Sequence, residues 1–265
     1  MPLPLPKPGT DFQRIVFKRN PLREVICQVR FDDILRIQSE VPVDFQERVG
    51  TAFPIYEEQQ TLELRLDEPL PKSPSASRSH LFKSEDLQTN CALSRGSISL
   101  STLSYTQWED FSKGISLAVD ALLATYGKSM KRVTRIGLRY RNIIDRDEIN
   151  MKKRLWRKLI NKSLLGPLSL SSVNEVEVPQ LHQVFRFDYQ DVSALIQAGL
   201  INETKREKSA FFIDVDLFLE SPISTNARSI MEVVERLHSY SGPLFHWATT
   251  EELRRALGSV EASDA

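Results

Sequence analysis

The chain has 265 residues, of which 41% are hydrophobic and 26% charged, and its formal net charge at pH 7 is +0. These values are ordinary for a soluble globular protein and exclude a general attraction of the whole molecule to nucleic acid or anionic membranes. No apolar run approaches the roughly 20 residues that cross a bilayer, and prolines from Pro2 onward interrupt the layout of a signal peptide. We therefore expect a cytoplasmic protein in which Cys27 and Cys91 are free, reduced thiols.

The first half of the chain predicts an extended arm followed by strands and short helices. Proline occupies every second position from residue 2 to residue 8, which indicates an extended arm over residues 1–20. Phe45, Val49 and Phe53 recur at helical spacing and predict a short helix. The remaining segments follow from alternation and turn residues: a strand at 24–31, a strand around 62–66, a loop at 70–80 and an antiparallel meander up to residue 105.

The clearest helix is expected at 106–127. Its apolar stripe follows a capping pair formed by Thr106 and Glu109, and Gly127 ends it. The second half of the chain then predicts these elements: strands at 175–189 and 209–220, a helix at 224–242 that ends at Gly242-Pro243, and a last helix that begins after Thr249 and ends at Gly258.

Strands that follow one another through turns, with long helices laid across them, indicate an α+β fold. We expect antiparallel sheet packed on two long amphipathic helices. Residues 97–127 and 209–242 share the order strand, turn and helix, which suggests two similar halves. The expected division is an N-terminal half at 21–145, a C-terminal half at 146–258 and a loose tail at 259–265.

The sequence contains none of the common catalytic signatures. A dinucleotide-binding glycine motif, a P-loop and a nucleophile elbow are all missing, and no histidine is spaced from another histidine or a cysteine as metal ligands are. We therefore expect no cofactor, no metal and no catalytic residues, and we favour a protein that is not an enzyme.

Positive charge is concentrated in the middle of the chain. Residues 128–162 contain 13 basic and three acidic residues, a net charge of +10. Within this basic segment, residues 148–162 have the pattern of an amphipathic helix, whose polar half carries Lys153, Arg154, Arg157 and Lys158. Such a helix could contact the phosphates of a nucleic acid, an acidic protein or anionic lipid, or it could be a solvated face whose long side chains cover apolar surface.

The sequence RIGLRYRNII, residues 135–144, predicts a strand whose even-numbered residues form an apolar face. Its opposite face presents Arg135, Arg139 and Arg141, with Gly137 among them. One interpretation pairs these arginines across the sheet with carboxylates on other strands, the candidates being Asp214, Asp216, Glu220, Glu175 and Glu177. The other interpretation is an anion-binding groove, in which Gly137 lets a ligand approach the backbone.

Five segments, taken together in this order, carry a resemblance: NPLREVICQVRF, FQERVGTAFPIYEE, YTQWEDFSKGI, VTRIGLRYRNII and HSYSGPLFHWATTEELRRALG. The chain resembles a sporadically distributed prokaryotic protein family of about this length, whose most specific part is the R-I-G-L-R-Y-x-N core at Arg135–Asn142. No activity or site residue can be carried over from that family. The resemblance implies a conditional role beside a partner protein, in a mobile or phage-defence system.

The leading hypothesis is thus a non-catalytic interaction protein with a protein partner or larger assembly. The alternative is a nucleic-acid-binding protein that uses residues 128–162. A third hypothesis, an enzyme without a recognisable motif, would need a pocket that gathers a histidine or paired carboxylates.

Overall fold

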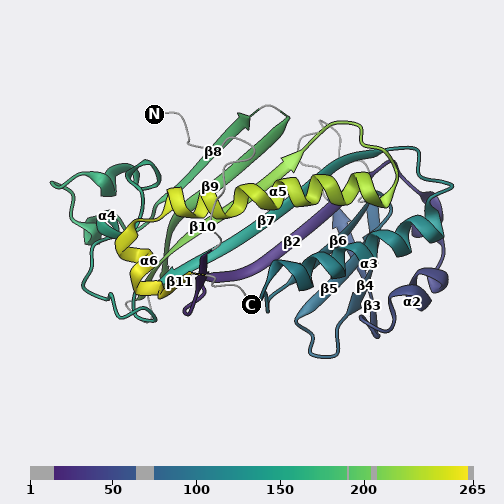
Figure 1. The fold of residues 1–265 in the computed structure, drawn as a ribbon, viewed down its shortest axis with the longest axis horizontal. Coiled ribbons are helices and arrows are strands. Elements are labelled where there is room, and N and C mark those ends of the chain that lie inside the picture. Colours follow the sequence, from purple (N-terminus) through teal and green to yellow (C-terminus); the bar gives the residue numbers. More distant parts are fainter. Residues whose placement is uncertain (1–14, 64–74, 190, 204–207, 262–265) are drawn as a thin grey trace. The chain divides into compact units, whose positions relative to one another are not determined.

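The computed structural model describes residues 15–63, 75–189, 191–203 and 208–261 (Figure 1). The fold is α+β, with large antiparallel β-sheet structure and six α-helices in these residues. The chain divides into two compact units: unit 1 comprises Met1–Arg23, Arg139–Phe218 and Glu235–Ala265, and unit 2 comprises Glu24–Leu138 and Leu219–Val234. No helix among the described residues is long and apolar enough to cross a membrane.

Unit 2 is built around antiparallel strands in the order β3-β4-β5-β6-β2-β7, of which β7 contributes its first part. The bounds are β2 (Leu22–Phe31), β3 (Ile55–Glu63), β4 (Ser75–Lys83), β5 (Thr89–Ser94), β6 (Ser97–Thr102) and β7 (Val133–Asp145). Alternation in β2 buries Val25, Cys27, Val29 and Phe31, as the sequence predicted.

Three helices belong to unit 2: α1 (Leu35–Ser39), α2 (Val43–Val49) and α3 (Trp108–Tyr126). The predicted short helix is α2, which buries Phe45 and Val49. The predicted long helix is α3, but its N-cap is Gln107 and no side chain caps it, so the proposed Thr106 cap is wrong. At Gly114 the helix comes so close to β6 that an added Cβ atom would lie 2.9 Å from Cδ2 of Leu100.

The loop predicted at 70–80 is wrong for Ser75–His80, which belong to β4, while residues 70–74 and the predicted strand residues 64–66 lie outside the described part. Pairing with β3 on one side and β5 on the other satisfies the backbone of this polar stretch. The fully buried His80 contributes too, since its ring bonds the Tyr56 hydroxyl at 3.0 Å and the Ile37 carbonyl oxygen at 2.9 Å. Composition alone suggested a loop because it does not reveal these partners.

Unit 1 contains the second part of β7 in the strand order β7-β10-β9-β8 and a separate β1–β11 pair. The bounds are β1 (Ile15–Phe17), β8 (His182–Tyr189), β9 (Val192–Glu203), β10 (Lys208–Leu219), β11 (Ser259–Glu261), α4 (Trp156–Leu159), α6 (Glu251–Leu257), and the short 3-10 helices at Lys162–Leu164, Gly166–Ser169 and Glu175–Glu177. Helix α5 (Ala227–Ala248) begins in unit 2 and ends in unit 1.

Two helix ends differ from the prediction. Helix α5 does not stop at Gly242-Pro243 but continues through Pro243 to Ala248, where the buried Leu244 and Ala248 hold its last turns against the core. The last helix, α6, has Thr250 rather than Thr249 as its N-cap, with the Thr250 side chain accepting a hydrogen bond from the Leu253 backbone. Gly258 ends α6 in the left-handed conformation, at φ 72°.

The basic helix predicted over 148–162 is also wrong, because only Trp156–Leu159 of this range are α-helical. Asn150 has a positive φ of 59°, which interrupts any helix there. The Trp156 backbone N–H donates to the carboxylate of Glu175 instead of to a carbonyl of a preceding helical turn. Glu175 and Glu177, expected in a strand, form a short 3-10 helix, and tertiary contacts outweigh local propensity in both segments.

Candidate partner-binding face of unit 1

Two arginines of β7 converge on one carboxylate of β10. Arg139 donates from Nε to Oδ1 of Asp214 at 2.7 Å and from Nη2 to Oδ2 at 2.6 Å. The Nε atom of Arg141 lies 3.6 Å from Oδ2 of the same carboxylate. Because the Asp214 side chain is only 12% exposed, this bidentate pair fixes the Arg139 guanidinium group in one orientation. Among the carboxylates considered from the sequence, Asp214 thus pairs with both Arg139 and Arg141.

Arg135 lies in unit 2 and has its own carboxylate partner. Its Nε atom is 3.5 Å from Oε1 of Glu220, and its side chain is 12% exposed. The Arg135 guanidinium group also covers Gly137, where an added Cβ atom would collide with it. The alternative interpretation used Gly137 as the point where a ligand approaches the backbone, and in this structure the Arg135 guanidinium group occupies that space.

The side of the sheet that carries Asp214 of β10 also carries side chains of β9 and β8. The registers of these three strands place Val184 opposite Gln197 and Gln197 opposite Asp214. Because side chains alternate along a strand, every second residue of each strand, counted from these three residues, lies on the same side of the sheet. We call this surface the arginine face. It consists of Arg139, Arg141, His182, Val184, Arg186, Asp188, Ser193, Leu195, Gln197, Phe212, Asp214, Asp216 and Phe218.

The opposite face of these strands packs against the C-terminal part of α5, which crosses in front of them in Figure 1. The Tyr140 hydroxyl bonds Nδ1 of His238 at 2.8 Å, and the rings of Tyr189 and Tyr240 meet edge to face at 6.4 Å. Ala194, Ile196 and Ala198 of β9 are buried on this side. In contrast, every β8 residue on the arginine face is exposed, including Val184 at 56%.

The arginine face mixes apolar groups with charges that neighbours hold in place. The His182 ring lies 5.6 Å from the Phe212 ring, and the Arg186 guanidinium carbon lies 5.3 Å above the Phe218 ring. Asp188 accepts a hydrogen bond from the Ser193 hydroxyl at 2.5 Å and one from Arg186 Nε at 3.1 Å. The Ser193 bond and then the Arg186 bond lower the pKa of the Asp188 carboxyl, so it stays ionised at neutral pH.

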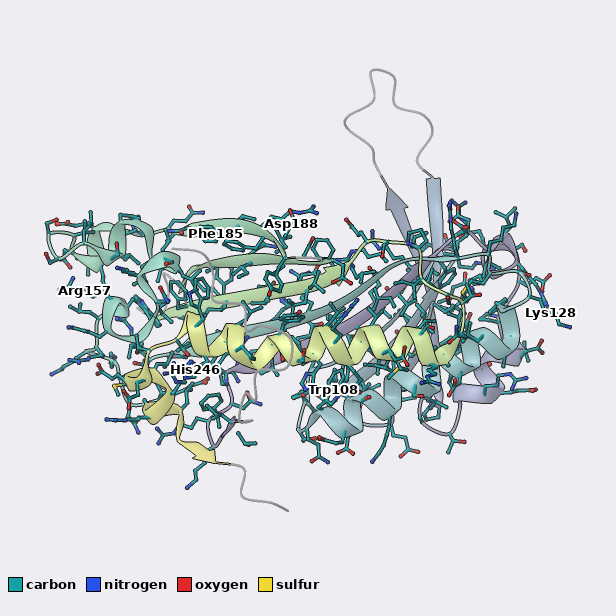
Figure 2. The ribbon with its side chains drawn as sticks, turned by 45° about the horizontal axis from the view of Figure 1, so that its top comes forward. Trp108, Lys128, Arg157, Phe185, Asp188 and His246 are labelled. Carbon is teal, nitrogen blue, oxygen red and sulfur yellow. The ribbon has the colours of Figure 1, made fainter. Side chains whose placement is uncertain are left out.

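The basic segment is divided in the structure. Arg154 donates to Glu252 from Nη2 at 2.7 Å, and this bond lowers the pKa of the Glu252 carboxyl. Lys153 and Lys158 are exposed and Arg157 is half-buried. Arg157 belongs to α4, and Figure 2 shows it apart from Asp188 of β8. We therefore treat the basic side chains in and next to α4 as a second surface of unit 1. We call it the lysine end and define it as Lys152, Lys153, Arg157, Lys158 and Lys162.

Sequence reasoning did not identify most of the arginine face. It selected Arg139, Arg141 and Asp214, but not His182, Val184, Arg186, Leu195 or Gln197. The signal that could have found them is the alternation within β8, whose residues are exposed at even positions and half-buried at odd positions. Which strands neighbour one another is a long-range property that alternation does not reveal.

The described residues contain no group of three or more His, Cys, Asp or Glu side chains that could hold a metal ion. Burial and then the charge of Arg254 lower the pKa of His246. Burial raises the pKa of both thiols, Cys27 and Cys91, to about 12. No protein-family model matches the sequence, and neither does any curated protein.

Proposed function

We propose that the protein is a non-catalytic interaction protein that binds a partner protein through the arginine face of unit 1. The observation that carries the proposal is the bidentate Arg139–Asp214 pair, set beside half-exposed apolar side chains on a sheet face whose β8 residues are all exposed. Aromatic residues and arginine are enriched in the cores of protein interfaces. On the arginine face, the half-exposed Phe212 and the exposed Arg141 and Arg186 fit that composition, and Val184 and Leu195 add apolar surface on β8 and β9.

Fixed side chains also favour binding energetically. A side chain that is ordered before association loses less conformational entropy when the complex forms. Arg139 is held by two hydrogen bonds and Arg186 by Asp188 and the Phe218 ring, so both guanidinium groups present a defined direction. An acidic, partly apolar protein surface is the partner chemistry that these groups fit.

The test begins with native purification of the tagged protein, expressed together with the products of its neighbouring genes. A protein recovered in fixed stoichiometry is then titrated by calorimetry against two variants of the arginine face, Leu195→Gln and Arg141→Glu. We expect each variant to weaken binding at least about tenfold, the effect of losing one anchor of about 1.4 kcal/mol. The matched control is Leu170→Gln, because Leu170 is 55% exposed and lies outside the arginine face. Equal affinities for all variants would contradict the proposal.

A narrower proposal adds that the protein acts in the cytoplasm, in a prokaryotic mobile or phage-defence system. Its support is the sequence resemblance at Arg135–Asn142 and the flanking segments. It predicts that cells carrying the gene with its neighbours lower the plating efficiency of some phages, and that Arg141→Glu abolishes this protection. Equal plating on cells with and without the genes, over a broad phage panel, would count against it.

The second candidate function is nucleic-acid binding, favoured by the exposed ammonium groups of the lysine end. Fluorescence anisotropy with labelled single-stranded RNA and duplex DNA would test it at several salt concentrations. Binding that uses the lysine end should weaken steeply with salt, by a log–log slope of about −0.9 per duplex phosphate neutralised. Lys153→Glu should remove this binding, and Lys113→Glu, a change at an exposed lysine of unit 2, should leave it intact.

The proposal of two similar halves, each with a long amphipathic helix packed on antiparallel strands, rests on a shared order of elements. Strand β6 precedes α3, and strand β10 precedes α5. Superposition of these two strand–helix pairs in an experimental structure would support a duplication, and incompatible helix directions would refute it.

A further inference from the structure

Strand β8 is the last strand in the order β7-β10-β9-β8, so one of its edges has no neighbouring strand among the described residues. The Leu200 N–H donates to the Leu181 carbonyl at 2.9 Å, which makes these two residues a hydrogen-bonded pair. Hydrogen-bonded and non-hydrogen-bonded pairs alternate along an antiparallel ladder. The odd-numbered residues Gln183, Phe185 and Phe187 therefore bond β9, and the backbone groups of the even-numbered residues point outward.

The outward residues are His182, Val184, Arg186 and Asp188, whose side chains are also exposed. An edge of this kind can accept a further strand, which gains main-chain hydrogen bonds along its length. The edge carries one acidic and one basic side chain near its C-terminal end and an imidazole at its start. This order of side chains makes the strand complementary to a second copy of itself, running antiparallel.

We propose that β8 of one molecule pairs with β8 of a second copy across a two-fold axis, with Phe185 opposite Phe185 of that copy. In this register His182 faces the partner's Asp188, and Val184 faces the partner's Arg186. Every outward N–H and C=O of the four even-numbered residues then meets a complementary group. The register two residues to one side places Arg186 opposite another Arg186, and like charges opposite one another are unfavourable. The register two residues to the other side places His182 opposite Arg186 and leaves Asp188 without an opposing β8 residue.

Three features support a second copy as the occupant. Asp188, whose carboxyl pKa is lowered by the Ser193 and Arg186 hydrogen bonds, stays ionised and lies opposite the His182 imidazole in this register. The register pairs all four outward residues of β8, whereas a register shifted by two residues in either direction leaves one of the four unpaired on each strand. The stacked rings of Phe185 and Phe187, with centroids 6.2 Å apart, would meet the same rings of the second copy at the centre of the joined strands.

The first measurement is the mass of the full-length protein by light scattering and sedimentation over a range of concentrations. We expect a concentration-dependent dimer. Val184→Pro should convert it to a monomer, because proline at 184 removes an outward N–H but no hydrogen bond to β9. Val184→Ser keeps that N–H and should remain dimeric. Circular dichroism of both variants checks that the fold persists.

Disulfide trapping tests the register itself. Two residues opposite each other in a non-hydrogen-bonded pair have Cα atoms about 4.5 Å apart, which is within disulfide reach. Phe185→Cys should therefore cross-link to Phe185→Cys of the second copy under mild copper–phenanthroline oxidation. Phe187→Cys, on the same face and equally half-buried, should not, since it would lie opposite Gln183. The native thiols, Cys27 and Cys91, are both buried and should contribute no background.

A protein that stays monomeric at all concentrations overturns the proposal, as does equal cross-linking at positions 185 and 187. If the protein is monomeric and Val184→Pro instead abolishes binding of a different protein, the edge belongs to that partner and self-pairing is refuted. The outcome is separate from that of the proposed function, because partner affinity is measured with Leu195→Gln and Arg141→Glu, which leave the backbone of β8 unchanged.

Discussion

Arg139 and Asp214 form a bidentate ion pair across β7 and β10, with donor–acceptor distances of 2.7 and 2.6 Å. Arg141 lies near the same carboxylate, so the buried Asp214 interacts with both arginines. The pair answers why the strand RIGLRYRNII carries several arginines on one face. Arg139 and Arg141 are matched by Asp214, and Arg135 is matched by Glu220.

The carboxylate of Asp214 should therefore matter for stability. Asp214→Asn keeps the size of the side chain but removes the charge that receives two hydrogen bonds from Arg139. We expect the free energy of unfolding to fall by about 1–3 kcal/mol, as for a lost hydrogen bond to a charged group. Urea unfolding followed by circular dichroism measures this change. Asp188→Asn is the matched control, because its side chain is 64% exposed and also contacts an arginine, and it should change stability by less than about 0.5 kcal/mol.

Gly137 should resist substitution only while Arg135 is present. Alanine in a strand normally stabilises relative to glycine by about 0.4–1 kcal/mol through the unfolded state. At position 137, however, the new methyl group would displace the Arg135 guanidinium from its place near Glu220. We expect Gly137→Ala to destabilise the wild-type protein by about 0.5–1 kcal/mol and to stabilise an Arg135→Ala variant. The same sign in both backgrounds would show that Arg135 is not the obstacle.

The sequence predicted those parts of the fold in which local pattern and tertiary environment agree. Strand β2 alternates, and α3 has an apolar stripe, so both were found within a few residues. The polar Ser75–His80 was missed because its backbone is satisfied by β3 and β5, which lie on either side of it. Helix α5 passes Pro243 because burial of Leu244 outweighs the loss of one backbone hydrogen bond.

The candidate site was predicted less completely. The arginines and their acidic partner were recognised by type, but the choice between Asp214 and Glu175 depends on strand neighbours distant in sequence. Glu175 was considered as a partner of the β7 arginines at positions 135, 139 and 141, but it pairs with Arg146 at 2.9 Å. The arginine face needs the registers of β8, β9 and β10 together, and a single sequence does not contain that long-range information.

Both cysteines should be inert in the folded protein. Burial raises the pKa of Cys27 and Cys91 to about 12, so hardly any thiolate forms at neutral pH. We expect no reaction with Ellman's reagent at pH 8 in buffer, and reaction of both thiols after unfolding in guanidinium chloride. Rapid labelling of the native protein would contradict their burial.

The same shift predicts how stability depends on alkaline pH. A thiol whose pKa is raised by folding stays protonated in the native state while the unfolded chain releases its proton. The stability it contributes is therefore present below the ordinary thiol pKa of about 8.5, and it falls as the pH rises from there towards about 12. The melting temperature, measured from pH 8 to pH 11, should fall less steeply in Cys27→Ala/Cys91→Ala than in the wild type. Parallel slopes would mean that other groups, such as the buried tyrosines, account for the whole effect.

Glu175 should be the residue that orders the segment leading into the lysine end. Its carboxylate pairs with Arg146 and accepts the backbone N–H of Trp156, and the side chains of Glu175 and Arg146 are only 11% and 15% exposed. The Arg146 guanidinium carbon in turn lies 4.4 Å from the centre of the Trp156 ring. Glu175→Gln leaves that guanidinium group buried without its counter-charge, so we expect a loss of about 3 kcal/mol in the free energy of unfolding.

The neighbouring Glu177→Gln provides the control, because Glu177 is exposed and its loss should change stability by less than about 0.5 kcal/mol. Hydrogen exchange can locate the effect. In Glu175→Gln the amides of residues 150–158 should exchange faster, while those in the middle of β9 keep their protection because that strand is paired on both sides. Uniform acceleration across unit 1 would instead mean that Glu175 supports the whole unit, and then the lysine end could not change its conformation independently of the arginine face.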